Sequence, residues 1–140
     1  MKHKGSISQT YLERDRLIIP DLVRQAKHIV EYPTNLDKIF QVAATLPVNM
    51  FYIADDSAID YVRIRQRGKD RRFKNSYKQQ LYNSFYEEFD KLMQHTKYKN
   101  LCLKDLVIIA LTHPAPCVGL APNGIRKIYT RLRSKRKDNA

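Results

Sequence analysis

Apolar side chains recur every three or four positions through most of this 140-residue chain, which is the spacing of one face of an α-helix. The first such stripe begins after Thr10, whose spacing to Glu13 is that of a capping box, and Pro20 is expected to kink or restart the helix. A second stripe covers 36–46, and Asn35 precedes it as a predicted N-cap. The pattern therefore predicts helices from near the start of the chain.

The apolar pattern repeats at an offset of 67 residues, when 36–62 is aligned with 103–129. Five of the 27 aligned pairs are identical, against about one or two expected from average residue usage. The identical pairs are Leu36 and Leu103, Ala43 and Ala110, Thr45 and Thr112, Pro47 and Pro114, and Ala54 and Ala121. The repeat decides the structure of 103–113, because its run of apolar residues by itself fits a buried strand equally well. Its alignment with 36–46 predicts a helix.

Each copy continues through a connection that starts with proline, 47–53 in the first copy and 114–120 in the second, and we expect both to be extended. A last helix then follows in each copy. We expect it to open at a capping side chain, Asp55 or Asp56 in the first copy and Asn123 in the second.

These helices predict an all-α fold, in which two tandem trihelical units with a helix-turn-helix-like order pack as one compact domain. The first unit is 1–67, a basic connecting loop covers 68–76, and the second unit with a basic C-terminal tail is 77–140. Phe40 is expected to pack against the third helix of its own unit, and Ile59 to face outward. The long helix 77–95 is expected to bury Leu81, Phe85, Phe89 and Leu92.

Nearly all of the net charge of +12 lies in two short segments that follow the repeated pattern. The first segment, 63–78, has eight basic residues and one acidic residue: Arg63, Arg65, Arg67, Lys69, Arg71, Arg72, Lys74 and Lys78, with Asp70. The second, 126–138, has seven basic residues and one acidic residue: Arg126, Lys127, Arg131, Arg133, Lys135, Arg136 and Lys137, with Asp138. The remaining residues sum to −1. This pattern predicts two anion-facing surfaces.

Nucleic acid is the anionic partner that this charge favours, and we expect double-stranded DNA rather than RNA, bound through phosphates by all fifteen basic residues of the two segments. Phe73 and Tyr77 lie amid the first segment and are candidates for stacking on bases. One alternative is a structural or assembly protein, such as a virion or nucleoprotein component, that uses the basic segments to contact a partner or a packaged genome. Another is that the charges are only a solvated linker and tail.

No catalytic, metal-binding or cofactor-binding motif is apparent, so we expect neither an enzyme nor a cofactor. Cys102 and Cys117 are too few for a disulfide framework and do not have zinc-site spacing. No basic amphipathic helix with exposed large apolar residues, no lipidation signal and no leader-like apolar stretch is evident, so we expect no membrane partner. The expected location is cytoplasmic, or the virion if the protein is phage-encoded.

A helix followed by Pro-Ala-Pro, two aromatic residues and a second helix, twice in a small basic chain, resembles an uncharacterised family of small, internally duplicated helical proteins associated with mobile elements. Phe51 and Tyr52 keep the aromatic pair in the first copy, and 114–116 keeps the prolines in the second. The resemblance covers most of the chain and implies a duplication and a link to mobile elements or phage. It implies no activity.

Overall fold

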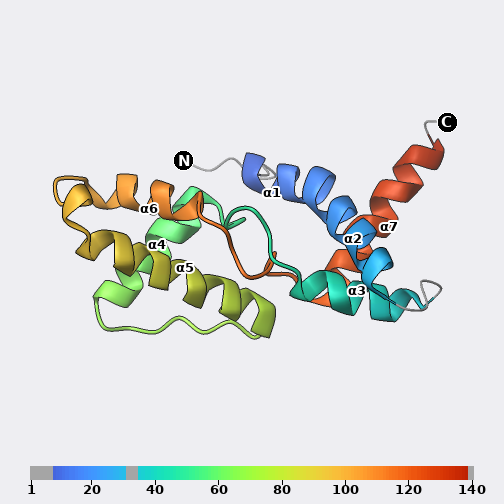
Figure 1. The fold of residues 1–140 in the computed structure, drawn as a ribbon, viewed down its shortest axis with the longest axis horizontal. Coiled ribbons are helices and arrows are strands. Elements are labelled where there is room, and N and C mark those ends of the chain that lie inside the picture. Colours follow the sequence, from blue (N-terminus) through green and yellow to red (C-terminus); the bar gives the residue numbers. More distant parts are fainter. Residues whose placement is uncertain (1–7, 31–34, 139–140) are drawn as a thin grey trace.

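The computed structural model describes the backbone of residues 8–30 and 35–138, and the side chains of these ranges as far as Ser134. The described elements are all helical, which confirms the all-α class (Figure 1). They are α1 (Gln9–Glu13), the π-helical turn η1 (Arg14–Ile18), α2 (Ile19–Ile29), α3 (Leu36–Thr45), α4 (Asp55–Gln66), α5 (Ser76–Gln94), the 3-10 turn η2 (Thr96–Tyr98), α6 (Leu103–Leu111) and α7 (Pro122–Asp138).

The first helix starts slightly earlier than predicted, because Ser8 rather than Thr10 is its N-cap and its side-chain oxygen accepts a hydrogen bond from the Thr10 N–H at 3.3 Å. The π-helical turn η1 ends at Ile18, and α2 starts at Ile19 with Pro20 in its first turn. Proline has no N–H to continue the regular hydrogen-bond ladder. The restart expected at Pro20 is therefore present.

The predictions for the short helices α3 and α6 are confirmed in type. Asn35 caps α3, with its Oδ1 accepting from the Lys38 N–H at 3.2 Å. The strand-like apolar run of the second copy forms α6. Its Leu106, Val107 and Ala110 are buried.

The predicted caps of the last helices are wrong. The N-cap of α4 is Ala54, which makes no side-chain hydrogen bond, and Asp55 and Asp56 lie in the first turn, where carboxylates are stabilised by the helix dipole. In the second copy α7 already begins at Pro122, because proline suits the first helical position. Asn123 therefore lies inside the helix.

Ile59 was expected to face outward and is buried instead. Ala58, Tyr61 and Val62 are buried with it, so the covered face of α4 is wider than a single stripe. The helix packs against α6, and the aromatic rings of Tyr61 and Tyr82 of α5 lie 4.9 Å apart between centroids. Because two helices cover α4, more of its circumference is buried than the sequence pattern of one amphipathic face predicts.

The third helix of each half packs on the first two helices of the other half. α7 lies against α3 and α2, at one end of the molecule, whereas α4 packs with α5 and α6 at the other end (Figure 1). The expectation that Phe40 packs on the third helix of its own unit is wrong, because its ring contacts Tyr129 of α7, with centroids 6.0 Å apart. Phe40 is nevertheless buried, as expected.

This exchange occurs at the two extended connections. Val48 and Ala115 pair there as an isolated antiparallel bridge, and each donates its N–H to the carbonyl of the other at 3.0 Å. The connections also supply the centre of the core, since Phe51, Tyr52 and Ile53 are each 1 % exposed. Each connection therefore leads its chain across the middle of the molecule before the last helix begins.

Equivalent features of the two halves differ by 67 residues. Ser8 and Asn75 are the N-caps of α1 and α5, and the bridge joins Val48 to Ala115. Helices α3 and α6 start at Leu36 and Leu103, and helices α4 and α7 start at Asp55 and Pro122. These equal offsets support the repeat proposed from the sequence, although the superposition of 10–67 on 77–133 stays a prediction.

Candidate nucleic-acid interface

The first basic segment begins on α4, which ends in a glycine stop. Gly68 has φ +76°, and the N–H groups of Gly68 and Lys69 donate to the carbonyls of Arg65 and Ile64. Arg63 and Arg67 are exposed and make no ion pair within the described residues. The end of α4 therefore presents two cations to solvent on a fixed backbone.

Arg65 differs from these neighbours because it is half-buried. Its guanidinium lies 4.5 Å from the ring centre of Tyr86 and 5.9 Å from that of Tyr61, and its Nη1 is 3.8 Å from a carboxylate oxygen of Asp70. Cation–π contacts of this kind favour arginine. Arg65 thus attaches the start of the connecting loop to the helices, and less of its charge is available to a ligand than that of Arg63 or Arg67.

The loop between α4 and α5 is fastened to the protein by Phe73. Its ring centre is 4.5 Å from that of Tyr82 and 6.2 Å from that of Tyr61, and its N–H donates to Gln79 Oε1 at 2.8 Å. Lys78 and Arg71 lie 4.8 Å and 5.3 Å from the same ring centre. Phe73 therefore already has aromatic and cationic neighbours from the chain itself.

Lys69, Arg72 and Lys74 of this loop are exposed and, within the described residues, have no cation–π contact with the Phe73 ring. The side chain of Arg72 is 86 % exposed and pairs with Asp70 at 3.1 Å. Tyr77, the second predicted stacking residue, is half-buried and packs against the core. The loop is thus a held backbone with exposed charges, and the two aromatic candidates serve its packing.

The second basic segment lies on α7. Arg126 and Arg131 are exposed, with guanidinium nitrogens 3.7 Å and 3.6 Å from carboxylate oxygens of Asp37 and Asp15. Arg133 lies 5.8 Å from the ring centre of Tyr129. The remaining cations of the segment are Lys127, which is exposed and makes no ion pair within the described residues, and Lys135, Arg136 and Lys137, whose side chains lie outside the described part.

Lys27 adds a cation that the segment analysis missed. Its Nζ lies 3.3 Å from Tyr129 Oη and 5.5 Å from the centre of that ring, so it joins the α7 surface from α2. The two residues are 102 positions apart in the chain. Only knowledge of which helix α7 packs against could have identified this contact.

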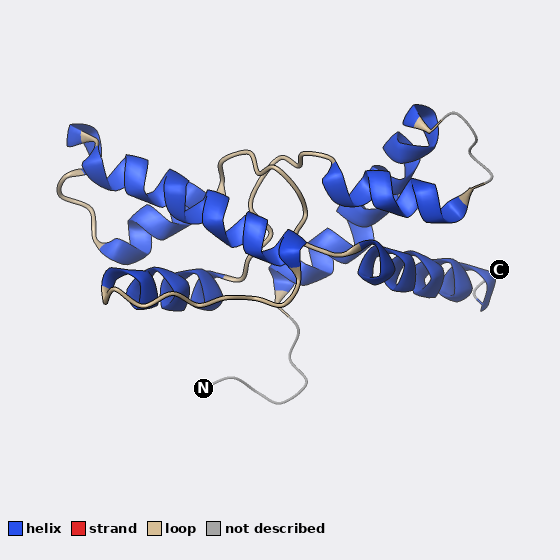
Figure 2. Cartoon of the chain, turned by 90° about the horizontal axis from the view of Figure 1, so that it is seen from below, coloured by secondary structure: helices blue, strands red, loops and turns tan. Residues whose placement is uncertain are grey.

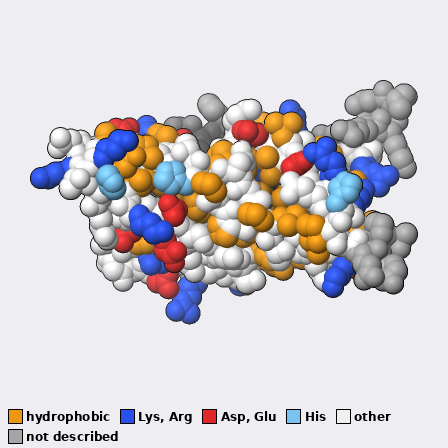
Figure 3. Space-filling model, in the orientation of Figure 1, with side chains coloured by type: hydrophobic (Ala, Val, Ile, Leu, Met, Phe, Trp, Pro, Cys, Tyr) orange, Lys and Arg blue, Asp and Glu red, His pale blue; other side chains and the backbone are white. Residues whose placement is uncertain are grey.

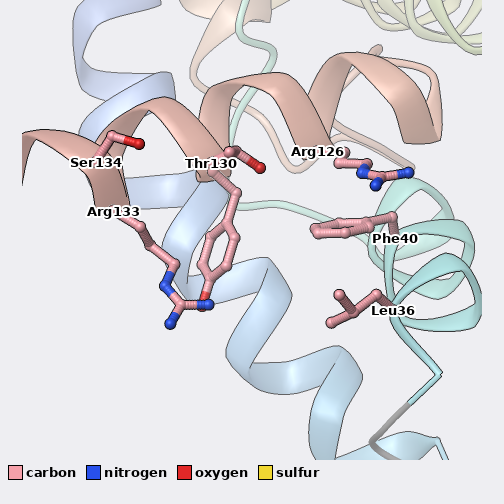
Figure 4. Close-up of a pocket in the computed structure, with 7 residues that line it drawn as sticks. Leu36, Phe40, Arg126, Thr130, Arg133 and Ser134 are labelled. Carbon is pink, nitrogen blue, oxygen red and sulfur yellow. The ribbon is translucent and has the colours of Figure 1, made fainter.

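A small pocket separates α3 from α7, with a volume of about 280 Å³. Leu36 and Phe40 of α3 form one wall, and Arg126, Arg133 and the hydroxyl side chains of Thr130 and Ser134 line the other (Figure 4). Both arginines come from α7 and already have partners in the chain, since Arg126 pairs with Asp37 and Arg133 lies against Tyr129. The pocket therefore belongs to the same basic surface of α7.

The two basic segments lie on the same side of the molecule, at opposite ends. In Figure 2, α7 runs along the lower edge to the C-terminus, and α4 with the long loop after it lies along the lower edge at the other end. Figure 3, in the orientation of Figure 1, shows the face turned to the viewer there, where apolar side chains lie across the middle and Lys and Arg lie mostly towards the ends. The segments are far apart in sequence, yet the elements that carry them lie along the same edge of the molecule in Figure 2.

The titratable groups in the core have packing roles. Burial raises the pKa of Tyr82 to about 12 and raises the pKa of the Cys117 thiol above its usual value. Within residues 8–30 and 35–138, no group of His, Cys, Asp and Glu is arranged to hold a metal ion. None of the described helices combines the length and apolar composition that a membrane span requires.

Comparison with protein-family models, with curated proteins and with solved structures gives no significant match to this chain.

Proposed function

We propose that this protein binds nucleic acid without catalysis, with double-stranded DNA as the preferred ligand, and that it contacts phosphates through the two basic segments. The observation that carries the proposal is the placement of both segments on one side of the molecule. Exposed arginines and lysines on ordered backbone contact phosphates without first paying the entropy of ordering a free linker.

The anchored loop favours this function over a merely solvated linker. A linker that served only to join α4 and α5 needs no aromatic anchor, whereas Phe73 and Arg65 hold its backbone against Tyr61, Tyr82 and Tyr86. Loop cations held in this way are suited to positioning a duplex by its backbone.

Helices α4 and α7 are the elements best placed to enter a groove. Both begin at the centre of the molecule and diverge towards its ends (Figure 1). Arg63 is exposed on α4 and Arg67 at the C-cap that follows it, and Lys127 and Arg131 are exposed on α7. An α-helix fits the major groove of B-DNA, where side chains at its surface reach base edges while flanking cations contact phosphates.

An assembly role, in which the basic segments bind an acidic partner protein, is the second candidate. The exposed apolar side chains Leu17 (64 % exposed) and Ile29 (58 % exposed) are the observation that favours it, since such residues are common at protein interfaces. In that case the affinity for duplex DNA would be no greater than that of any protein of similar charge.

A gel-shift series separates the two candidates. Duplex DNA, single-stranded DNA and duplex RNA of equal length are titrated with the full chain at physiological salt. The proposal expects a discrete complex with duplex DNA at the lowest protein concentration. The absence of a complex with all three ligands would contradict it and favour the assembly role.

A further inference from the structure

We infer that one copy of this chain covers two unlike half-sites on one face of a single DNA duplex, one beneath α4 and the loop that follows it and one beneath α7. This inference rests on the function proposed above. It adds the form of the ligand: a duplex long enough to be contacted at two places about one helical turn apart.

The two surfaces lie at equivalent places in the two halves of the molecule. The bridge between Val48 and Ala115 joins residues of the same position in each half, so it lies where an axis relating the halves would pass. Helices α4 and α7 start 67 residues apart, beyond that bridge, and lie on the same side at opposite ends of the molecule (Figure 2). Dimeric DNA-binding proteins present their two reading helices in this way.

The length of the molecule is close to the distance between two consecutive major grooves on one face of DNA. A compact chain of this length has a radius of gyration of about 14 Å and therefore extends over roughly 40 Å. Successive major grooves on one face of B-DNA are ~34–36 Å apart. The molecule is therefore long enough for surfaces at its opposite ends to reach two consecutive grooves.

The distance between the two surfaces is fixed by the packing of the core. The connections are held to each other by the Val48–Ala115 pair, and the first connection is held to the end of α6 by the hydrogen bond from the Phe51 N–H to the Leu111 carbonyl at 2.9 Å. Because each third helix packs on the other half, the two ends cannot separate without losing core contacts. The surfaces therefore act at a constant distance and not as two domains on a flexible tether.

The two surfaces carry different side chains at equivalent positions. Exposed residues at equivalent positions of α4 and α7 differ in chemistry: Asp60 and Lys127, Arg63 and Thr130, and Arg67 and Ser134. Equal side chains would favour an inverted repeat, since they would contact the same bases in each groove. Unlike side chains predict two half-sites of different sequence.

The test measures the affinity of the full chain for random-sequence duplexes of 10 and 24 base pairs, corrected for the number of possible binding registers. We expect the longer duplex to bind at least about tenfold more tightly per register, because the second surface binds at a high effective concentration. The Arg63→Gln/Arg67→Gln variant is expected to lose most of this preference for length. Circular dichroism of the variant checks that it stays folded.

Lys97→Gln/Lys99→Gln is the matched control. It removes the same charge from exposed positions at the turn between α5 and α6, outside both basic segments. The control should keep the full length preference. Equal affinity per register for both duplexes, or equal loss in both variants, would overturn the inference while leaving DNA binding intact. A chain that binds neither duplex would overturn the proposed function itself and the inference with it.

Discussion

Gly119 lies where a side chain would meet the core. Its φ is +84°, and a Cβ at this position would come within 2.5 Å of Leu81 Cδ2. Gly119→Ala should therefore lower the free energy of unfolding by about 2–5 kcal/mol, through left-handed backbone strain and overpacking. Gly68, with φ +76° and open space around it, is the control, and Gly68→Ala should cost only about 1–2 kcal/mol. Urea denaturation measures both, and equal losses would contradict the close contact.

Phe40 tests the helix exchange at a single side chain. It is 4 % exposed and packs edge-on against Tyr129, so Phe40→Ala should cost about 3–5 kcal/mol as a large-to-small change in the core. Leu36→Ala, one turn earlier on α3 and 51 % exposed, should cost well under half of that. Thermal denaturation of the two variants compares them. An unchanged melting temperature for Phe40→Ala would place this ring outside the core.

For single residues, the sequence predicts the features that depend on the geometry of one helix. The cap at Asn35 and the burial of Phe85 and Phe89 follow from spacing along one helix. The exposure of Ile29 and the burial of Ile59 do not, because both depend on which helices lie across the surface. A periodic pattern identifies the apolar face of a helix, but it does not show how much of the helix surface the neighbouring helices bury.

The packing of α6 on α5 includes a link that responds to pH. His113 and Glu88 are hydrogen-bonded at 3.0 Å, and this bond lowers the pKa of the Glu88 carboxyl below its usual value. A carboxyl with a depressed folded-state pKa stabilises the protein above its unfolded pKa, and this contribution is lost as the pH falls through the folded value. Stability should therefore fall on acidification below about pH 4.5.

Glu88→Gln should reduce this acid dependence, because the amide does not titrate. Urea midpoints at pH 7 and at pH 3 measure the effect in both proteins. Glu87→Gln, an exposed neighbour on α5 for which the structure gives no such bond, serves as the control. The same acid-induced loss in the wild-type protein and in Glu88→Gln would contradict a stabilising role for this link.

The two basic elements should differ in what they contribute to DNA binding. Arg71→Gln/Arg72→Gln in the loop should weaken all duplex sequences alike, since loop cations contact phosphates. Arg63→Gln on α4 should instead change the ranking of sequences, since a helix in a groove reaches base edges. Selection from a random duplex library measures both profiles. A loop variant with an altered preference would reverse these assignments.

The sequence predicts the helix α4 and the charged loop after it, but not the contacts that hold this loop to the rest of the protein. The glycine that ends α4 follows from turn chemistry although the N-cap of this helix does not, and the charge of the loop is evident from composition. The anchor through Phe73 and Arg65 is not, because aromatic residues near arginines fit base stacking as well as internal packing. Only the position of α5 beneath the loop decides between these interpretations.

At the scale of the whole molecule, the repeat predicts two equivalent halves but not how they share their helices. A third helix that packs on its own half and one that crosses to the other half bury closely similar apolar faces, so periodicity cannot distinguish them. Which arrangement forms depends on whether the extended connection leads the chain back to its own half or on to the other half. Here the connections pair at Val48 and Ala115 and continue, which places α7 with α3 and α4 with α6.

The salt dependence of duplex binding tests the central claim most directly. If about six to ten phosphates are neutralised, the slope of log K against log salt should lie between about −5 and −9. Arg63→Gln/Arg67→Gln should make this slope less negative by about 2, whereas Lys97→Gln/Lys99→Gln should leave it unchanged. A slope near zero, or a slope that neither basic segment alters when its cations are removed, would contradict the account.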